Sequence, residues 1–541
     1  MMGGARRDSA SPAVQETGGV TTREMPSRES GADPEQQEVQ TDPATVLAGE
    51  PTGSLKEQSV RGGATVFASQ AVLQCLSIGS SMVLARLLAP SDFGLLAMVT
   101  AVTGFAAIFR DMGLSMSTVQ RQTITHAQVS TLFWINVAVG CGLALVLSAA
   151  APLVAKFYGR PELLTITLAI APTFVFSSLG IQHGALLRRQ MRFAAVASVQ
   201  IASTSIGIAV AILFALIGLR YWALVAQMLA DSLVNAAGLW LASGWRPGPP
   251  SRRAGTRGML SFGANITAFE VVNYFSRNLD NILIGRMHGS TALGFYSKAY
   301  SLLMLPINNI RMPITTVALS ALSRLVSSPE RYRAYYLEML SIIAFLSMPL
   351  VTLLFVCSEG VIRLMLGSQW DAASPLFQLL AITAFIQPAA STWGAVLVSS
   401  GQGARYFRWG AFNAAATSLA FLIGVRWGAA GVAIAYAIVN YLLLYPSFWY
   451  CFRNTPVKPG DFFLGIWRPA VASLLMGLAL YRGYPCLAAW PDIAAVPACC
   501  LAGVVLYLII WMLLPGGMSS LRQHLPYMTL IFRGAKRSGT T

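Results

Sequence analysis

Charged and amide side chains interrupt stretches of this chain that are otherwise apolar over about 18 or more residues. Placing one charge in hydrocarbon costs at least about 2.5–3.5 kcal/mol, so such residues usually bind something, pair or line a hydrated space. The densest set lies between residues 259 and 285, at spacings that keep its members on one helix face. Its members are Glu270, Asn273, Arg277, Asp280 and Asn281.

Two further cations, Lys298 and Arg311, occupy the next apolar stretch. Together with Arg277 they outnumber the acids Glu270 and Asp280, so a cavity lined by these residues would be slightly positive. A guanidinium group binds phosphate through two parallel hydrogen bonds, whereas an ammonium group acts as a point charge. The pattern therefore predicts a hydrated cavity that binds an anionic group such as a phosphate.

Structural roles compete with this interpretation. Arg277 and Asp280 are spaced as a helical pair that would only neutralise itself, and Lys298 could instead pair with Asp280. Asp231 belongs to another polar face, shared with Gln227 and Asn235, which either lines a cavity or joins neighbouring helices. These alternatives remain open at the level of sequence.

An internal repeat supports a cavity shared by two halves. Residues 59–94 align with residues 259–294 at a constant offset of 200, and the polar residues of the two stretches coincide. Gln74, for example, corresponds to Tyr274. Repeated membrane halves with polar groups at membrane depth are typical of transporters. The candidate substrate-binding residues are Arg277, Lys298, Arg311, Asn281 and Gln74, the candidate coupling or cavity acids are Glu270, Asp280 and Asp231, and no catalytic or metal-binding residues are expected.

The elements that must position these residues are membrane helices. The chain has 541 residues, of which 55% are hydrophobic and 11% charged, whereas a soluble protein carries about a quarter charged residues. We predict an all-α polytopic membrane protein with about 14 transmembrane helices, arranged as two pseudo-symmetric six-helix lobes plus a C-terminal helix pair. The predicted parts are a disordered tail (1–60), an N-lobe (61–244), a linker (245–258), a C-lobe (259–452), appended helices (453–515) and a C-terminal tail (516–541).

The charge distribution predicts the orientation. Alternate loops carry 21 Lys and Arg residues on one side and 8 on the other, which places both termini in the cytoplasm. This asymmetry accounts for the net charge of +16 without nucleic-acid binding. The seven cysteines form no C-x-x-C pair, so neither a disulfide framework nor a metal site is expected. Basic residues near the C-terminus predict contact with membrane lipids.

A further ordered set of short motifs lies at residues 85–94, 110–114, 279–286, 293–296 and 318–324. This set resembles the polysaccharide transporter, or oligosaccharide flippase, family of the multidrug/oligosaccharidyl-lipid/polysaccharide exporter superfamily. The resemblance covers roughly residues 58–515. It implies a flippase of the bacterial inner membrane that moves an undecaprenyl-pyrophosphate-linked oligosaccharide for surface polysaccharide synthesis. Alternating access of two lobes is the mechanism that two repeated halves joined on one side predict. The expected partners are this lipid-linked oligosaccharide and the polysaccharide polymerase and assembly machinery.

Two other classes of membrane protein are alternatives to a flippase. A drug or metabolite exporter of the multidrug and toxin extrusion type would bind hydrophobic cations, which acidic residues favour and Arg277, Lys298 and Arg311 disfavour. A membrane enzyme such as a polymerase or ligase would need a larger outer loop than residues 358–373, so no enzymatic activity is expected. No cofactor is expected beyond a coupling ion, either a proton or sodium.

Overall fold

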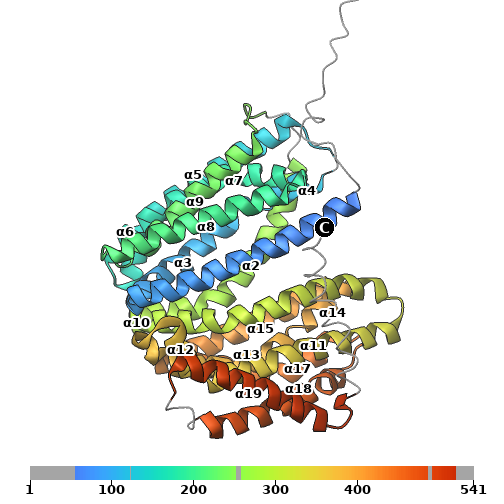
Figure 1. Cartoon of the computed structure of the whole chain (residues 1–541). Coiled ribbons are helices and arrows are strands. Elements are labelled where there is room, and N and C mark those ends of the chain that lie inside the picture. The colour runs from blue at the N-terminus through green and yellow to red at the C-terminus, as the bar shows by residue number, and fades with distance from the viewer. Residues whose placement is uncertain (1–54, 122, 252–256, 485–489, 519–541) are drawn as a thin grey trace, which may run out of the picture. The chain divides into compact units, whose positions relative to one another are not determined.

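The computed structural model describes residues 55–121, 123–251, 257–484 and 490–518, except for the side chains of residues 55–61, 64, 257–273, 275 and 276 (Figure 1). This part of the chain contains helices and no strands. The longer helices are α2 (Leu55–Leu87), α3 (Pro90–Asp111), α5 (His126–Tyr158), α7 (Pro172–Arg189), α8 (Phe193–Leu216), α9 (Trp222–Ser243), α10 (Arg257–Leu325), α11 (Pro329–Val356), α13 (Ser374–Ala390), α15 (Gly403–Gly424), α16 (Gly428–Leu442), α18 (Pro459–Gly483) and α19 (Asp492–Leu513). The shorter elements are α4 (Leu114–Gln120), α6 (Glu162–Ile170), α12 (Ser358–Leu366), η1 (Ser368–Ala373), α14 (Trp393–Ser399), η2 (Val425–Trp427) and α17 (Leu444–Cys451).

The protein is a multi-pass, all-helical membrane protein, as its composition predicts. Within the described ranges, 12 segments are long and apolar enough to cross a bilayer. Two of them, Arg277–Leu325 and Gly403–Leu442, are 49 and 40 residues long, and each contains a backbone break. These breaks lie at Gly289, with φ of 80°, and at η2, which is followed by Gly428 with φ of 79°. The total of fourteen spans stays a prediction.

The break at Gly289 has a counterpart at the equivalent position of the first half, so the sequence repeat is reflected in the backbone. Ala89 separates α2 from α3, and Gly289 interrupts α10 at the same offset of 200. Asp92 fixes the first break because its carboxylate accepts a hydrogen bond from the Ala89 amide at 3.1 Å. Gly289 permits the second because its φ of 80° is disfavoured for residues that carry a Cβ. The boundaries of the predicted lobes are not themselves tested.

The helix starts that follow the two breaks cross at backbone contact. A Cβ built on Gly94 would lie 1.7 Å from the carbonyl oxygen of Ser290, and one built on Gly294 would lie 1.9 Å from that of Pro90. Residues 94 and 90 align with 294 and 290, so the same contact is made twice with the partners exchanged. Such a reciprocal contact is what a two-fold axis between repeats produces.

Helix packing groups the remaining elements. In the first half (α2–α9), α2 packs on α8, while α7 packs between α5 and α9. In the second half (α10–α17), α11, α13, α15 and α16 pack with α10 (Figure 1). The described part of the predicted linker, residues 245–251, is anchored on α5 rather than free. The amides of Gly248 and Ser251 donate to the hydroxyls of Ser130 and Thr131 at 2.9 Å and 3.0 Å.

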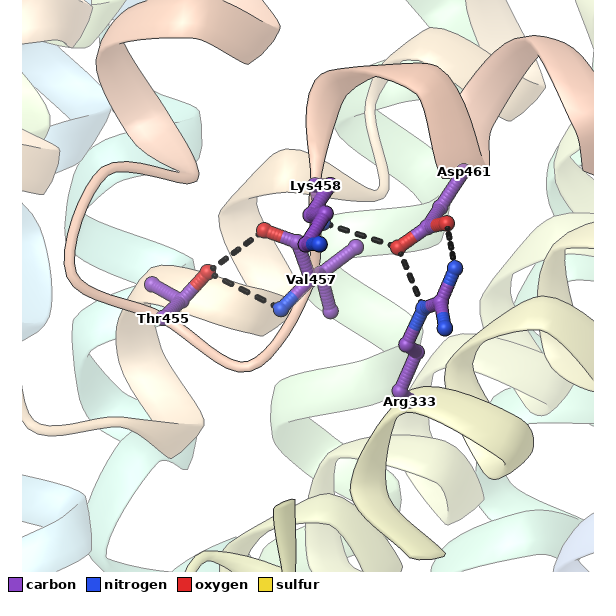
Figure 2. Close-up of polar contacts among 5 residues, drawn as sticks. All are labelled: Arg333, Thr455, Val457, Lys458 and Asp461. Carbon is purple, nitrogen blue, oxygen red and sulfur yellow. Dashed lines mark hydrogen bonds and ion pairs between the residues drawn. The ribbon is translucent and has the colours of Figure 1, made fainter. Parts of the chain in front are cut away.

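The appended helices α18 and α19 pack on α11, and one carboxylate fixes the start of α18. Figure 2 shows Asp461, whose oxygen accepts from the backbone amide of Lys458 at 2.8 Å and from Arg333 Nε at 2.8 Å. The preceding turn is closed by the Thr455 hydroxyl, which donates to the Val457 carbonyl at 3.3 Å. Asp461 therefore caps α18 and joins it to α11 at the same time.

Side chains from η1 cap the end of α2. The Trp370 indole N–H donates to the Ala85 carbonyl at 2.8 Å, and the Gln369 amide donates to the carbonyls of Ala85 and Leu88, the latter at 3.2 Å. The Arg86 guanidinium donates to a carbonyl of α12 at 2.8 Å. The last carbonyls of a helix have no partner within it, so donors from the second half here complete a helix of the first.

Candidate functional site

The second half encloses a cavity of about 600 Å³, within the range of small-molecule sites. Helices α10, α13, α15 and α16 form its walls, and α14 and α17 contribute at one end. Three of its described lining residues are charged, and all three lie on α10. They are Arg277, Asp280 and Arg311.

Both arginines face the cavity with neutral partners or none. Arg311 donates to the Ser391 hydroxyl at 3.2 Å and to the side-chain oxygen Oδ1 of Asn308 at 3.5 Å. Arg277 is exposed and makes no ion pair with any described residue. The two guanidinium groups lie on opposite sides of the Gly289 break and are near enough to repel each other. An anion between them would relieve that repulsion.

Asp280 does not neutralise Arg277. One carboxylate oxygen accepts a hydrogen bond from the Tyr296 hydroxyl at 2.9 Å. The other accepts one from the backbone amide of Asn281 at 2.8 Å. The ring of Tyr296 stacks on that of Tyr300, which lines the cavity, at 6.5 Å between centroids. Asp280 is therefore held against the wall, and the ion pair considered from the sequence is not among the described contacts.

Lys298 lies outside this cavity. Its ammonium donates to the Ser81 hydroxyl at 3.1 Å and sits 4.1 Å from the centroid of the Phe93 ring. Ser81 belongs to α2 and Phe93 to α3, so Lys298 joins the second half to the first. The pairing with Asp280 that the sequence allowed is not observed among the described residues.

Neither of the two other predicted binding residues, Gln74 and Asn281, is a lining residue of the cavity. Gln74 is partly exposed on α2 and does not line the cavity. Asn281 points elsewhere, with a buried Oδ1 that accepts no hydrogen bond from the described residues. Tyr274, the counterpart of Gln74 in the repeat, donates to carbonyls of α3, including that of Ala101 at 2.9 Å. The side chain of Glu270 lies outside the described residues.

Asp231 lies between two helices of the first half. A Cβ built on Gly207 of α8 would approach the Asp231 Cβ to 3.3 Å, and one oxygen of the carboxylate is buried without a described partner. On the same face, Asn235 donates to the Ser203 hydroxyl of α8 at 3.4 Å. This placement favours the interhelical role that the sequence left open for Asp231.

Arg86 and Arg286, which also align in the repeat, both make contacts outside the cavity. Arg86 donates to a carbonyl of α12, as described above. Arg286 lies over the ring of Phe157 on α5, 5.8 Å from its centroid.

Sequence reasoning missed the wall that faces α10. This wall consists of polar and aromatic residues of α13–α16, and none of its described residues carries a charge. A charge within an apolar stretch is the signal that identifies the candidates on α10, so these neutral residues do not stand out in the same way. A search for amides within apolar stretches would have found three of them. These residues are Gln387, Trp393, Tyr406, Asn413, Tyr436 and Asn440.

Comparisons with known proteins identify relatives over most of the chain. The family described as polysaccharide biosynthesis protein matches residues 83–375, which is more than half of the chain. The lipopolysaccharide biosynthesis protein WzxC of Escherichia coli is 25% identical over 431 residues, covering 78% of this chain and 86% of the relative. The succinoglycan biosynthesis transport protein ExoT of Rhizobium meliloti is 29% identical over 404 residues, covering 74% and 81%.

Solved structures show the fold. A lipid II flippase, MurJ, in an inward closed conformation superposes with a TM-score of 0.66 at 14% identity, covering 87% of this chain and 99% of that one. An inward-facing multidrug resistance MATE family transporter of the MOP superfamily gives a TM-score of 0.54 at 14% identity, covering 74% and 95%. At these identities the likeness concerns the arrangement of helices alone.

Proposed function

The chain belongs to the family of polysaccharide biosynthesis proteins, and from this premise we propose that it translocates an undecaprenyl-pyrophosphate-linked oligosaccharide across the bacterial inner membrane. One relative is named a succinoglycan biosynthesis transport protein, which supports a transporter rather than an enzyme. In this proposal the diphosphate and the sugars bind in the cavity of the second half, while the polyprenyl chain stays in lipid. The charge asymmetry of the loops supports cytoplasmic termini.

The observation that carries the proposal is the pair of arginines in the cavity. Arg277 and Arg311 line it without a described carboxylate partner, although placing an unpaired guanidinium at membrane depth is costly. A diphosphate offers oxygens to both guanidinium groups and would balance their charge. A cation exporter would need the opposite balance, whereas Asp280 is the single carboxylate among the described lining residues.

Alternating access would move the two halves against each other around the crossing of α3 and α10. The reciprocal backbone contact there supports this proposal because a glycine stands at each of the two points of closest approach, so backbone meets backbone at both. Contacts that join the halves, such as Lys298 with Ser81, would break and re-form during transport. A proton or sodium ion remains the proposed source of energy, with Asp280 as the acid that lines the cavity.

The test is export of surface polysaccharide by a strain that lacks the gene and carries a variant on a plasmid. A charge-assisted hydrogen bond contributes about 1.5–3 kcal/mol, so losing a bidentate pair should lower transport by more than about tenfold. We expect Arg277→Ala to abolish export with normal protein in the membrane, and Arg277→Lys to restore part of it. Arg286→Ala is the matched control, because Arg286 lies on the same helix outside the cavity.

A double variant separates binding from folding. If Arg277 served only to balance Asp280, replacing both with Ala would leave export intact. We expect the double variant to fail as Arg277→Ala does. Normal export by the double variant would refute the binding role of Arg277. Unchanged surface polysaccharide in the deletion strain itself, together with lost resistance to cationic drugs, would replace the proposed substrate with a drug.

A further inference from the structure

The cavity is chemically divided. Its charged lining residues, among those that the structure describes, all lie on α10, whereas the lining residues of α13–α16 are neutral. We refer to this surface as the amide–aromatic wall. Its residues are Gln387, Trp393, Tyr406, Asn413, Tyr436 and Asn440.

The amides of this wall retain unused hydrogen-bonding groups. Asn440 donates to the carbonyl of Tyr436 in its own helix at 2.9 Å, and Gln387 donates to the Tyr436 hydroxyl at 2.8 Å. Both contacts use the amide nitrogen, and the side-chain oxygens of Asn440 and Gln387 accept no hydrogen bond from a described residue, so they remain available as acceptors. Asn413 makes no side-chain hydrogen bond within the described ranges and keeps both its donor and its acceptor.

Aromatic rings lie beside these amides. Trp393 and Tyr406 pack with ring centroids 5.5 Å apart at 44°, and both line the cavity. Tyr436 packs on Phe421 at 5.4 Å. Rings that combine an apolar face with a polar edge suit ligands with the same division. A pyranose has apolar C–H faces and a rim of hydroxyls, which match the rings and the unused acceptors respectively.

From this division we propose that the amide–aromatic wall is a saccharide subsite that seats a neutral hexopyranose, the sugar joined to the diphosphate. The arginines of α10 take the diphosphate, and Asn413 and Trp393 hold the ring of the sugar. The inference rests on the proposed function and adds to it that sugar identity is read by neutral groups on α13–α16. Charge on the glycan plays no part in this contact.

Binding to the purified full chain in lipid nanodiscs tests this subsite. The probes are a short-chain polyprenyl diphosphate without sugar and the same lipid carrying one glucose, galactose or N-acetylglucosamine. We expect at least one sugar-bearing probe to bind about tenfold more tightly than the sugarless one. Asn413→Leu and Trp393→Ala should each remove about five- to tenfold of that preference without changing the affinity for the sugarless probe.

Two further variants complete the design. Asn309→Leu is the matched control, because Asn309 is an exposed amide of α10 that does not line the cavity. Arg277→Ala should weaken every probe by a similar factor. Equal affinity of the intact protein for all four probes would overturn the saccharide subsite while leaving the diphosphate site in place. The same holds if Asn413→Leu and Trp393→Ala weaken all four probes equally or leave them unchanged. Failure of the intact protein to bind any of the four would count against the proposed function itself.

Discussion

Adding one methyl group at Gly94 should force the two halves apart. The new Cβ would lie 1.7 Å from the Ser290 carbonyl oxygen, 2.5 Å from the carbonyl carbon and 2.9 Å from Cα, all of them backbone atoms. Neither a rotamer change nor a flexible side chain can relieve this contact. To open it to 3.0 Å, the helix starts must separate by about 1.3 Å. Gly294→Ala meets the Pro90 carbonyl in the same way, at 1.9 Å.

The magnitude follows from that separation. Overpacking a core typically costs about 1–3 kcal/mol, and a rigid backbone on both sides places Gly94→Ala at the upper end or beyond. A gap of 0.5–1 Å already loses about a quarter to a half of each dispersion contact along the crossing. Gly142 of α5 is the matched control, since a Cβ there meets nothing within 4 Å. Gly142→Ala should stabilise its helix by about 0.5–1 kcal/mol.

Unfolding of the purified protein by a denaturing detergent measures both effects. We expect Gly94→Ala to be less stable than Gly142→Ala by about 4 kcal/mol. The double variant Gly94→Ala with Gly294→Ala should lose less than the sum of the two, because one separation makes room for both methyl groups. Equal stability of Gly94→Ala and Gly142→Ala would refute the backbone crossing, and strict additivity would refute the shared separation.

Four further outcomes are expected. Asp231→Asn should leave export unchanged and stability equal or higher, because it removes a partly unpartnered buried carboxylate; lost export with normal stability would contradict the interhelical role. Asp461→Ala should cost about 2–4 kcal/mol in the same detergent titration, since it removes a helix cap and the partner of Arg333 together, and a loss under about 0.5 kcal/mol would contradict this. Trp370→Phe should cost about 0.5–1.5 kcal/mol through the lost hydrogen bond to α2, and unchanged stability would show that the ring alone holds the contact. A reporter fused at residue 250 should be cytoplasmic, and a periplasmic signal would invert the predicted orientation.

Sequence patterns predicted the break points of the helices better than their faces. The repeat at an offset of 200 placed Gly289 opposite Ala89, and the backbone breaks at both positions. Arg277, Asp280 and Arg311 were recognised as candidates because a charge in an apolar stretch stands out, and the fold brings all three to one cavity. Lys298 stood out equally, yet it contacts Ser81 and Phe93 elsewhere.

The neutral wall was missed for a physical reason. In a soluble helix, water and the protein core differ, so the apolar stripe reveals which side faces inward. In a membrane, lipid and the protein interior are both apolar, and a residue such as Asn413 or Trp393 gives little sign of the direction it faces. Asp231 is ambiguous in the same way, because the sequence allows it either to line a cavity or to join two helices. Its close approach to Gly207 favours the helix interface.

The sequence by itself determined the class of protein, the positions of most membrane helices and the excess of cations over acids. Membrane helices can be read from the sequence because the energy of each segment in lipid depends on its own composition. Tertiary structure alone decided which polar groups meet. Among the described residues, it left Arg277 and Arg311 without a carboxylate partner, tied Asp280 to Tyr296 and brought six neutral residues into the lining of the same cavity. Rotation of helices about their axes sets those meetings, and that rotation follows from close packing between segments far apart in the chain.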